Sequence, residues 1–84
     1  MEYKVLVKVF VPEIEKTVEV YLPVNRTISE VCKLLNKLIN EISSGAYPIK
    51  ENVALCNRIT SEFYTSSMYV RDTNIRNGAQ LVFF

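Results

Sequence analysis

NIRNGAQLVFF, residues 74–84, decides the fold of this chain. In this stretch a polar turn is followed by a strongly apolar run that reaches the last residue. Asn77-Gly78 predicts a turn with a positive φ angle, because glycine adopts that conformation at no steric cost. The run AQLVFF predicts a strand. Since the run is apolar throughout, we expect the strand to lie in the middle of a sheet, with neighbours on both sides.

The composition indicates one folded domain. The chain has 84 residues, of which 49% are hydrophobic, with two glycines and three prolines. A chain of this length forms one domain rather than two, and such a composition argues against disorder. We therefore expect a single domain over residues 1–84 that needs each of its apolar stripes for the core.

The charges indicate which classes of partner the protein binds, and the cysteines indicate its cellular compartment. Ten basic residues oppose nine acidic ones, for a net charge of +1. This balance favours neither a nucleic acid nor an anionic membrane as a partner. No apolar run reaches 18 residues, and Lys8 interrupts the first apolar stretch, so we expect neither membrane insertion nor a signal peptide. Without an export signal, Cys32 and Cys56 are expected to be reduced, buried thiols in a cytoplasmic protein.

Two alternating segments near the N-terminus predict an antiparallel hairpin. Residues 3–11, YKVLVKVFV, place Tyr3 and four valines on one face and Lys4, Leu6, Lys8 and Phe10 on the other. Residues 17–22, TVEVYL, alternate again after the polar turn PEIEK. A period of two with this much valine is typical of strands, and the short loop between the two runs predicts that they pair.

Thr27 and Glu30 mark the start of a helix. A Thr three residues before a Glu is a capping box, in which each side chain binds a free backbone N–H of the first turn. Ser43, Ser44 and Gly45 predict its end. Helical spacing defines one apolar face, made of Ile28, Val31, Cys32, Leu35, Leu38, Ile39 and Ile42. The polar residues of the opposite face are Glu30, Lys33, Asn36, Lys37, Asn40 and Glu41.

The remaining elements complete a two-layer α+β domain. A short strand is expected within residues 53–57 and a brief one at Phe63 and Tyr64, with Val70 as a core anchor. Packing the valine face of the hairpin on the helix buries both apolar surfaces. With the last strand beside the first, Leu81 and Phe83 enter the core, and the neighbouring side chains emerge on the opposite face. We expect a mixed sheet of four to five strands on one main helix.

This element order resembles the β-grasp, or ubiquitin-like, fold over essentially the whole chain. Residues 69–84 resemble the segment of ubiquitin-like proteins in which an apolar residue, Asp and Asn-Ile precede a turn and the last strand. The pattern D-x-x-I-x-N-G-x-x-L runs through Asp72, Ile75, Asn77, Gly78 and Leu81. It is most similar to the small bacterial YukD/EsaB-type proteins, which are free-standing ubiquitin-like domains associated with type VII secretion systems. The resemblance implies a component of such a system as the partner.

The C-terminal residues depart from the conjugating members of the superfamily. Those proteins, and the sulfur carriers of the same fold, end in a flexible Gly-Gly tail, since only glycine threads the active site of the activating enzyme. This chain ends at Phe84 in an apolar strand, so we expect neither conjugation nor sulfur transfer. The alternatives are a protein modifier or sulfur carrier whose Gly-Gly tail is absent from this chain, and a self-associating structural domain.

The sequence offers no constellation for catalysis. It has no histidine, the commonest general base and metal ligand, and two cysteines alone do not make a zinc site. Two glycines cannot form a glycine-rich phosphate loop. We therefore expect a protein that is not an enzyme and that binds no cofactor or metal.

The face of the sheet opposite the helix is the predicted interaction site. Partly apolar patches with a polar rim mark interaction surfaces, and ubiquitin-like domains typically bind partners through this side. Docking would use Leu6, Phe10, Val82 and Phe84, with Lys8 orienting the contact. In one alternative the 44–52 loop or the 60–70 segment covers the patch, and in another the strand facing is off by one residue. The full candidate patch is Leu6, Lys8, Phe10, Ala54, Cys56, Val82 and Phe84.

The predicted strand TVEVYL offers a second surface. An open strand edge can recruit another strand and so produce a homodimer or bind an extended peptide. Thr17, Glu19 and Tyr21 do little to prevent such pairing. We favour an ordinary edge, protected by its shortness and by neighbouring charges, with a homodimer through this edge as the alternative.

Overall fold

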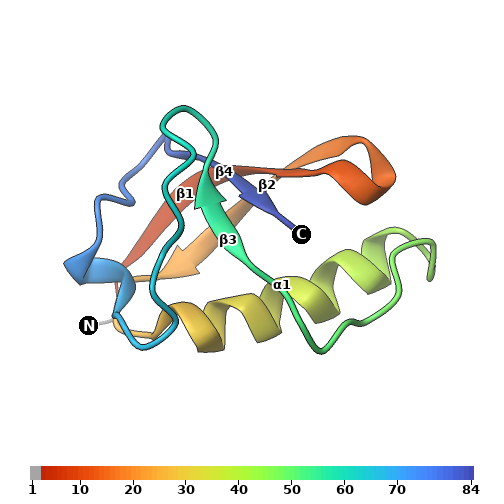
Figure 1. The fold of residues 1–84 in the computed structure, drawn as a ribbon, viewed down its shortest axis with the longest axis horizontal. Helices are drawn as coiled ribbons and strands as arrows, with labels where there is room; N and C mark the ends of the chain where they lie inside the picture. Colours follow the sequence, from red (N-terminus) through yellow and green to blue (C-terminus); the bar gives the residue numbers. More distant parts are fainter. Residues whose placement is uncertain (1–2) are drawn as a thin grey trace.

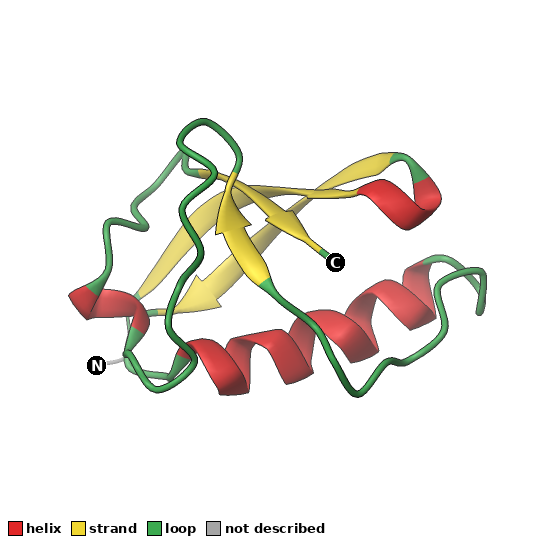
Figure 2. Ribbon diagram, viewed as in Figure 1, coloured by secondary structure: helices red, strands yellow, loops and turns green. Residues whose placement is uncertain are grey.

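The computed structural model describes residues 3–84, and the expected hairpin, helix and last strand all form (Figure 2). Two short 3₁₀ turns, Pro12–Ile14 and Val70–Asp72, lie in the connections. The regular elements, in chain order, are β1 (Lys4–Val11), β2 (Lys16–Pro23), α1 (Ile28–Ile42), β3 (Leu55–Asn57) and β4 (Gln80–Phe83).

Residues 3–84 form a sheet of four strands in the order β2-β1-β4-β3. β1 pairs antiparallel with β2 and parallel with β4, and β3 pairs antiparallel with β4. The last strand is therefore central, as its apolar sequence predicts. Figure 1 shows α1 along one face of this mixed sheet, and the predicted two-layer α+β architecture is confirmed.

The core lies between the sheet and α1. Val7, Val9 and Val11 of β1 are completely buried. On β4, Leu81 and Phe83 are equally buried, whereas Val82 is half-buried and Phe84 is exposed. The predicted facing of both strands is confirmed. The fully buried Val70 and Ile75 complete the same core from the connection before β4.

Local polar contacts fix the start of α1 and the turn before β4. The Thr27 hydroxyl accepts a hydrogen bond from the Glu30 N–H at 3.2 Å, and the Glu30 carboxylate accepts one from the Thr27 N–H at 3.1 Å. The latter bond lowers the pKa of Glu30. Gly78 has a φ of 86°, and its N–H donates to the Leu6 carbonyl at 2.8 Å. The Asn77 side chain accepts from the Leu6 N–H at 2.8 Å, so the turn is tied directly to β1.

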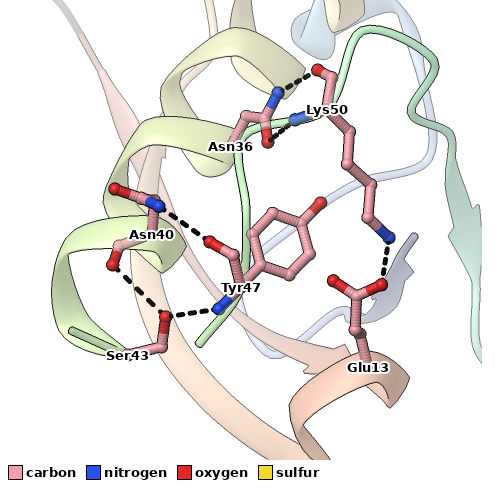
Figure 3. Close-up of polar contacts among 6 residues, drawn as sticks. All are labelled: Glu13, Asn36, Asn40, Ser43, Tyr47 and Lys50. Atoms are coloured by element: carbon pink, nitrogen blue, oxygen red, sulfur yellow. Dashed lines mark hydrogen bonds and ion pairs between the residues drawn. The ribbon is translucent and has the colours of Figure 1, made fainter. Parts of the chain in front are cut away.

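A polar clamp on one side of α1 corrects the predicted helix face (Figure 3). Asn36, expected on the outer face, is buried and exchanges two hydrogen bonds with the backbone of Lys50, at 2.5 and 3.1 Å. Asn40 donates to the Tyr47 carbonyl at 2.8 Å. These bonds pull residues 46–50 over the Asn36 side of the helix and bury Tyr47 against Phe83, with 6.1 Å between ring centroids.

The opposite side of α1 is correspondingly more exposed than expected. Leu38 and Ile42, predicted on the core face, are 36% and 52% exposed. Periodicity tells which residues share a helix face but not which neighbour covers that face. Because the chain after α1 folds back over the Asn36 side, the buried stripe shifts in that direction.

The third strand is shorter than expected. β3 spans Leu55–Asn57, rather than 53–57. Phe63 forms a single antiparallel bridge with Cys56 in place of the brief strand predicted at Phe63 and Tyr64. Within residues 3–84, no helix is long and apolar enough to cross a membrane.

Candidate protein-interaction face

The strand register brings one row of apolar side chains together on the face opposite α1. Phe10 lies opposite Val82, Val82 lies opposite Cys56, and Cys56 bridges to Phe63. Directly paired residues of neighbouring strands point to the same face of a sheet. Four segments far apart in the sequence thus contribute to one row across the outer face.

A polar row lies beside the apolar one. Lys8 is paired with Glu19 on β2 and with Gln80 on β4. The Arg58 N–H donates to the Gln80 carbonyl at 2.9 Å, which places Arg58 at the end of this row. The Arg58 guanidinium then lies over the Phe10 ring, 4.6 Å from its centroid, in a cation–π contact. Phe10 is consequently half-buried beneath a cation.

Two exposed aromatic rings meet at the β3 end of this face. Phe84 continues the pairing with β3, since it and Ala54 exchange two backbone hydrogen bonds. Its ring meets that of Phe63 nearly edge-on, with 5.8 Å between centroids and 70° between planes. Phe63 remains 59% exposed and Phe84 42% exposed, so the pair presents its rings to solvent.

The seven predicted residues contribute unequally to this face. Lys8 and Phe84 are exposed, and Phe10, Ala54 and Val82 are half-buried. Leu6 is half-buried and lies beyond the Lys8 row, so the structure does not bring it to the aromatic pair. Cys56 is only 7% exposed and offers little contact surface. Burial raises the pKa of its thiol, and Phe63 pairs alongside it.

Two contributors to the face were missed by sequence reasoning, namely Phe63 and Arg58. The chain reverses after β3 because the Asn57 side chain accepts from the N–H groups of Ile59 and Thr60, at 2.8 and 3.0 Å. The Asn57 N–H donates to the Glu62 carbonyl, which brings Phe63 back beside Cys56. Asn57, a residue type that favours turns, followed by Arg58 and Thr60 was the available signal for this turn. Phe63 of the 60–70 segment therefore lies beside the buried Cys56 and adds its own exposed ring to the face.

Among the residues that the structure describes, the outer face carries neither a metal cluster nor an ion pair. Within the described residues, no group of three or more His, Cys, Asp or Glu side chains could hold a metal ion. The one ion pair found in residues 3–84, Lys50–Glu13 at 2.7 Å, lies at the clamp beside α1 and not on this face.

Comparison with known proteins bears on the fold. No protein-family model and no curated protein matches the chain. Among solved structures, 96% of the chain is similar to part of a subunit in the "MycP5-free ESX-5 inner membrane complex, State II", with a TM-score of 0.79 and 21% identity. The chain spans only 20% of that subunit's length.

Two further solved structures match nearly end to end. The EccD5 ubiquitin-like domain from Mycobacterium xenopi matches 98% of this chain over 93% of its own length, with a TM-score of 0.79 and 15% identity. A chain of the toluene 4-monooxygenase HD complex matches 96% of each, with a TM-score of 0.75 and 8% identity. The chain therefore has the ubiquitin-like β-grasp fold. Because one fold serves such different assemblies, function has to be argued from the outer face.

Proposed function

We propose that this chain is a single-domain, non-conjugated ubiquitin-like adaptor that binds another protein through the outer face of its sheet. The observation that carries the proposal is the exposed Phe63–Phe84 pair, bordered by Arg58 over Phe10 and by Lys8. Aromatic and arginine side chains are enriched in protein interfaces and account for much of their binding energy. The polar rim supplied by Lys8 would orient the partner.

We further propose that the partner is a component of a type VII secretion system and that binding occurs at the cytoplasmic side. The ESX-5 subunit and the EccD5 ubiquitin-like domain support this assignment through their shared fold. The YukD/EsaB-like pattern of residues 72–81 supports it independently. In this chain that pattern is structural, since Ile75 and Leu81 are buried and Asn77-Gly78 anchors the last strand.

Affinity purification from the native host tests the proposal. Tagged wild-type protein should retain a secretion-system component, and Phe84→Asp should lose it while remaining folded, because an aspartate on this face replaces an apolar contact by a charge. Ile49→Asp is the matched control, since Ile49 is also exposed but lies in the loop after α1, away from the outer face. Retention of the same component by folded Phe84→Asp would contradict the proposal.

A modifier or sulfur carrier is the second candidate. Its chemistry requires a Gly-Gly tail, and the Phe84 backbone is still hydrogen-bonded to Ala54, so such a tail would have to begin after this residue. The reading frame beyond Phe84 distinguishes the two candidates. A Gly-Gly terminus would favour conjugation, and a stop codon would favour the adaptor.

A further inference from the structure

Within residues 3–84, the backbone groups along the outer edge of β2 have no partner strand. The Val24 N–H donates to the Tyr3 carbonyl at 3.0 Å, which identifies this pair as hydrogen-bonded. Hydrogen-bonded and non-hydrogen-bonded pairs alternate in an antiparallel ladder. In the β1–β2 register, Val18, Val20 and Leu22 therefore bond to β1. The backbone groups of the alternate residues, Thr17, Glu19 and Tyr21, point away from the sheet.

The side of α1 that faces this edge carries an apolar stripe. Leu34, Leu38 and Ile42 follow one another at intervals of four residues and are 54%, 36% and 52% exposed. Such spacing places all three on one side of a helix. It is the side opposite Asn36 and Asn40, which the polar clamp covers.

The Ile42 end of the stripe and the Lys16 end of the strand edge line one open cavity. This cavity of about 400 Å³ is bordered by Lys16 and Val18 of β2 and by Ile42 of α1, and its lining is completed by Glu13, Ile14, Ser43, Ser44 and Ala46. Figure 1 shows α1 running roughly antiparallel to β2, so the stripe continues from Ile42 in the direction in which β2 runs. The groove between α1 and the β2 edge thus offers free backbone groups on one side and apolar side chains on the other.

We propose that a second copy of this chain occupies the groove, with β2 of each copy paired antiparallel about a two-fold axis. β2 has the two features that a strand in this groove needs, because its valines alternate with the polar residues that carry the free backbone groups. The free backbone groups of one copy can pair with those of the other, and the valines can meet the apolar stripe. The two sheets then join into one continuous eight-stranded sheet, and the leucine stripes of the two helices face each other. Closed two-fold pairing satisfies both strand edges at once.

Charge and side-chain chemistry favour one of the three registers centred on Val18, Glu19 and Val20. A two-fold axis at Glu19 would place this carboxylate opposite its own copy, and like charges directly opposite are destabilising. An axis at Val18 would place Lys16 against Val20 of the other copy, on the side facing the apolar stripe. An axis at Val20 avoids both, because it pairs Glu19 with Tyr21 and Val18 with Leu22.

The border of the stripe carries one charge of each sign. Lys37 and Glu41 border the stripe on the solvent side of α1. When a two-fold axis brings the two stripes together, each helix therefore offers the other a lysine and a glutamate rather than charges of one sign. The dimer also carries the two outer faces on the same side of the joined sheet, so one dimer presents two binding surfaces to a partner assembly.

Disulfide trapping tests the pairing and its register. At the axis the two Val20 residues form a non-hydrogen-bonded pair, with Cα atoms about 4.5 Å apart, a separation that a disulfide can span. Under mild oxidation Val20→Cys should convert to a covalent dimer. Val18→Cys, which lies opposite Leu22, and the exposed Tyr21→Cys should link no more than wild type, whose own cysteines are buried. Efficient linking of Val18→Cys or Tyr21→Cys, or none by folded Val20→Cys, would overturn the proposal.

Sedimentation of the unmodified chain provides a second readout that does not depend on cysteine. Wild type should show a concentration-dependent dimer, and Glu19→Ala should preserve it. Glu19→Pro removes only an outward N–H and introduces a ring at the pairing edge, so it should weaken dimerisation about tenfold or more. A wild-type chain that stays monomeric at every accessible concentration would overturn the second-copy assignment and leave the groove to an extended peptide.

Discussion

The two sides of this small sheet end differently. At the β3 edge, the Tyr64 N–H donates to the Leu55 carbonyl and the Asn57 N–H to Glu62, so the chain covers its own strand edge. On that same side, residues 46–50 are clamped to α1 by Asn36 and Asn40. At the β2 edge, backbone groups and the Leu34–Ile42 stripe stay exposed. The chain thus covers the β3 edge of the sheet with its own residues and leaves the β2 edge open. The β2 edge is therefore where an external strand can add.

The largest expected contrast is between two adjacent leucines of α1. Leu35 is 1% exposed in the core, whereas Leu34 is 54% exposed on the β2 side. Leu35→Asp buries an unpaired charge and should cost about 4 kcal/mol or more, enough to unfold the domain. Leu34→Asp should change stability by no more than about 0.5 kcal/mol in the monomer. Circular dichroism with urea titration measures both, and similar losses would refute the assigned helix face.

Proline substitutions along β2 sharpen the contrast between its two rows of backbone groups. Val18→Pro removes an N–H that bonds to β1 and should cost about 3 kcal/mol. Glu19→Pro removes an N–H that points outward and should cost about 1 kcal/mol or less at protein concentrations too low for pairing. Chemical denaturation of the two variants would give the opposite order if the hydrogen-bonding alternation of β2 were reversed.

Opening the covered edge should have an intermediate effect. Asn57→Ala removes the acceptor of the Ile59 and Thr60 N–H groups, with a cost of about 1–2 kcal/mol. Because that turn holds residues 62–64 on β3, hydrogen exchange of the Tyr64 amide should accelerate. Asn52→Ala is the matched control, since Asn52 is exposed. Unchanged Tyr64 protection in Asn57→Ala would show that the edge is held by other contacts.

The smallest expected effect is a pH dependence of stability that comes from Cys32, on the covered side of α1. Burial raises the pKa of this thiol from 9.0 to about 11. The folded state therefore holds the proton more tightly than the unfolded state, and the resulting stabilisation is complete below pH 9 and is lost as the pH rises toward 11. At pH 10 the loss is about 1 kcal/mol.

The difference in unfolding free energy between wild type and Cys32→Ala isolates the contribution of this thiol. That difference should shift against wild type between pH 8 and pH 10, when both proteins are unfolded with urea at each pH. A difference that does not depend on pH would place the Cys32 thiol in a solvated environment.

Much of the fold could be predicted because its signals are local. Valine alternation defined the hairpin, Thr27 and Glu30 defined the start of α1, and Asn77-Gly78 introduced a central apolar strand. The exposed side of α1 could not be predicted in the same way. It depends on residues 46–50 folding over Asn36. This contact joins residues 14 positions apart, and no periodic pattern in the sequence indicates it.

The outer face was predictable in part for the same reason. Alternation along β1 and β4 placed Lys8, Phe10, Val82 and Phe84 away from the helix, and the structure agrees. The contribution of Phe63 depends on the turn at Asn57, and the position of Arg58 over Phe10 depends on pairing between β1, β4 and the end of β3. Sequence patterns within one strand do not report contacts across several strands.

Binding of the purified partner to matched surface variants tests the central proposal most directly. Isothermal titration calorimetry would compare wild type with Phe63→Asp on the outer face and Ile49→Asp in the loop after α1, both exposed positions in a folded domain. We expect Phe63→Asp to raise the dissociation constant about tenfold or more and Ile49→Asp to leave it unchanged. Unchanged affinity of Phe63→Asp, with loss of affinity in Ile49→Asp, would contradict the proposal and place the partner on the other side of the molecule.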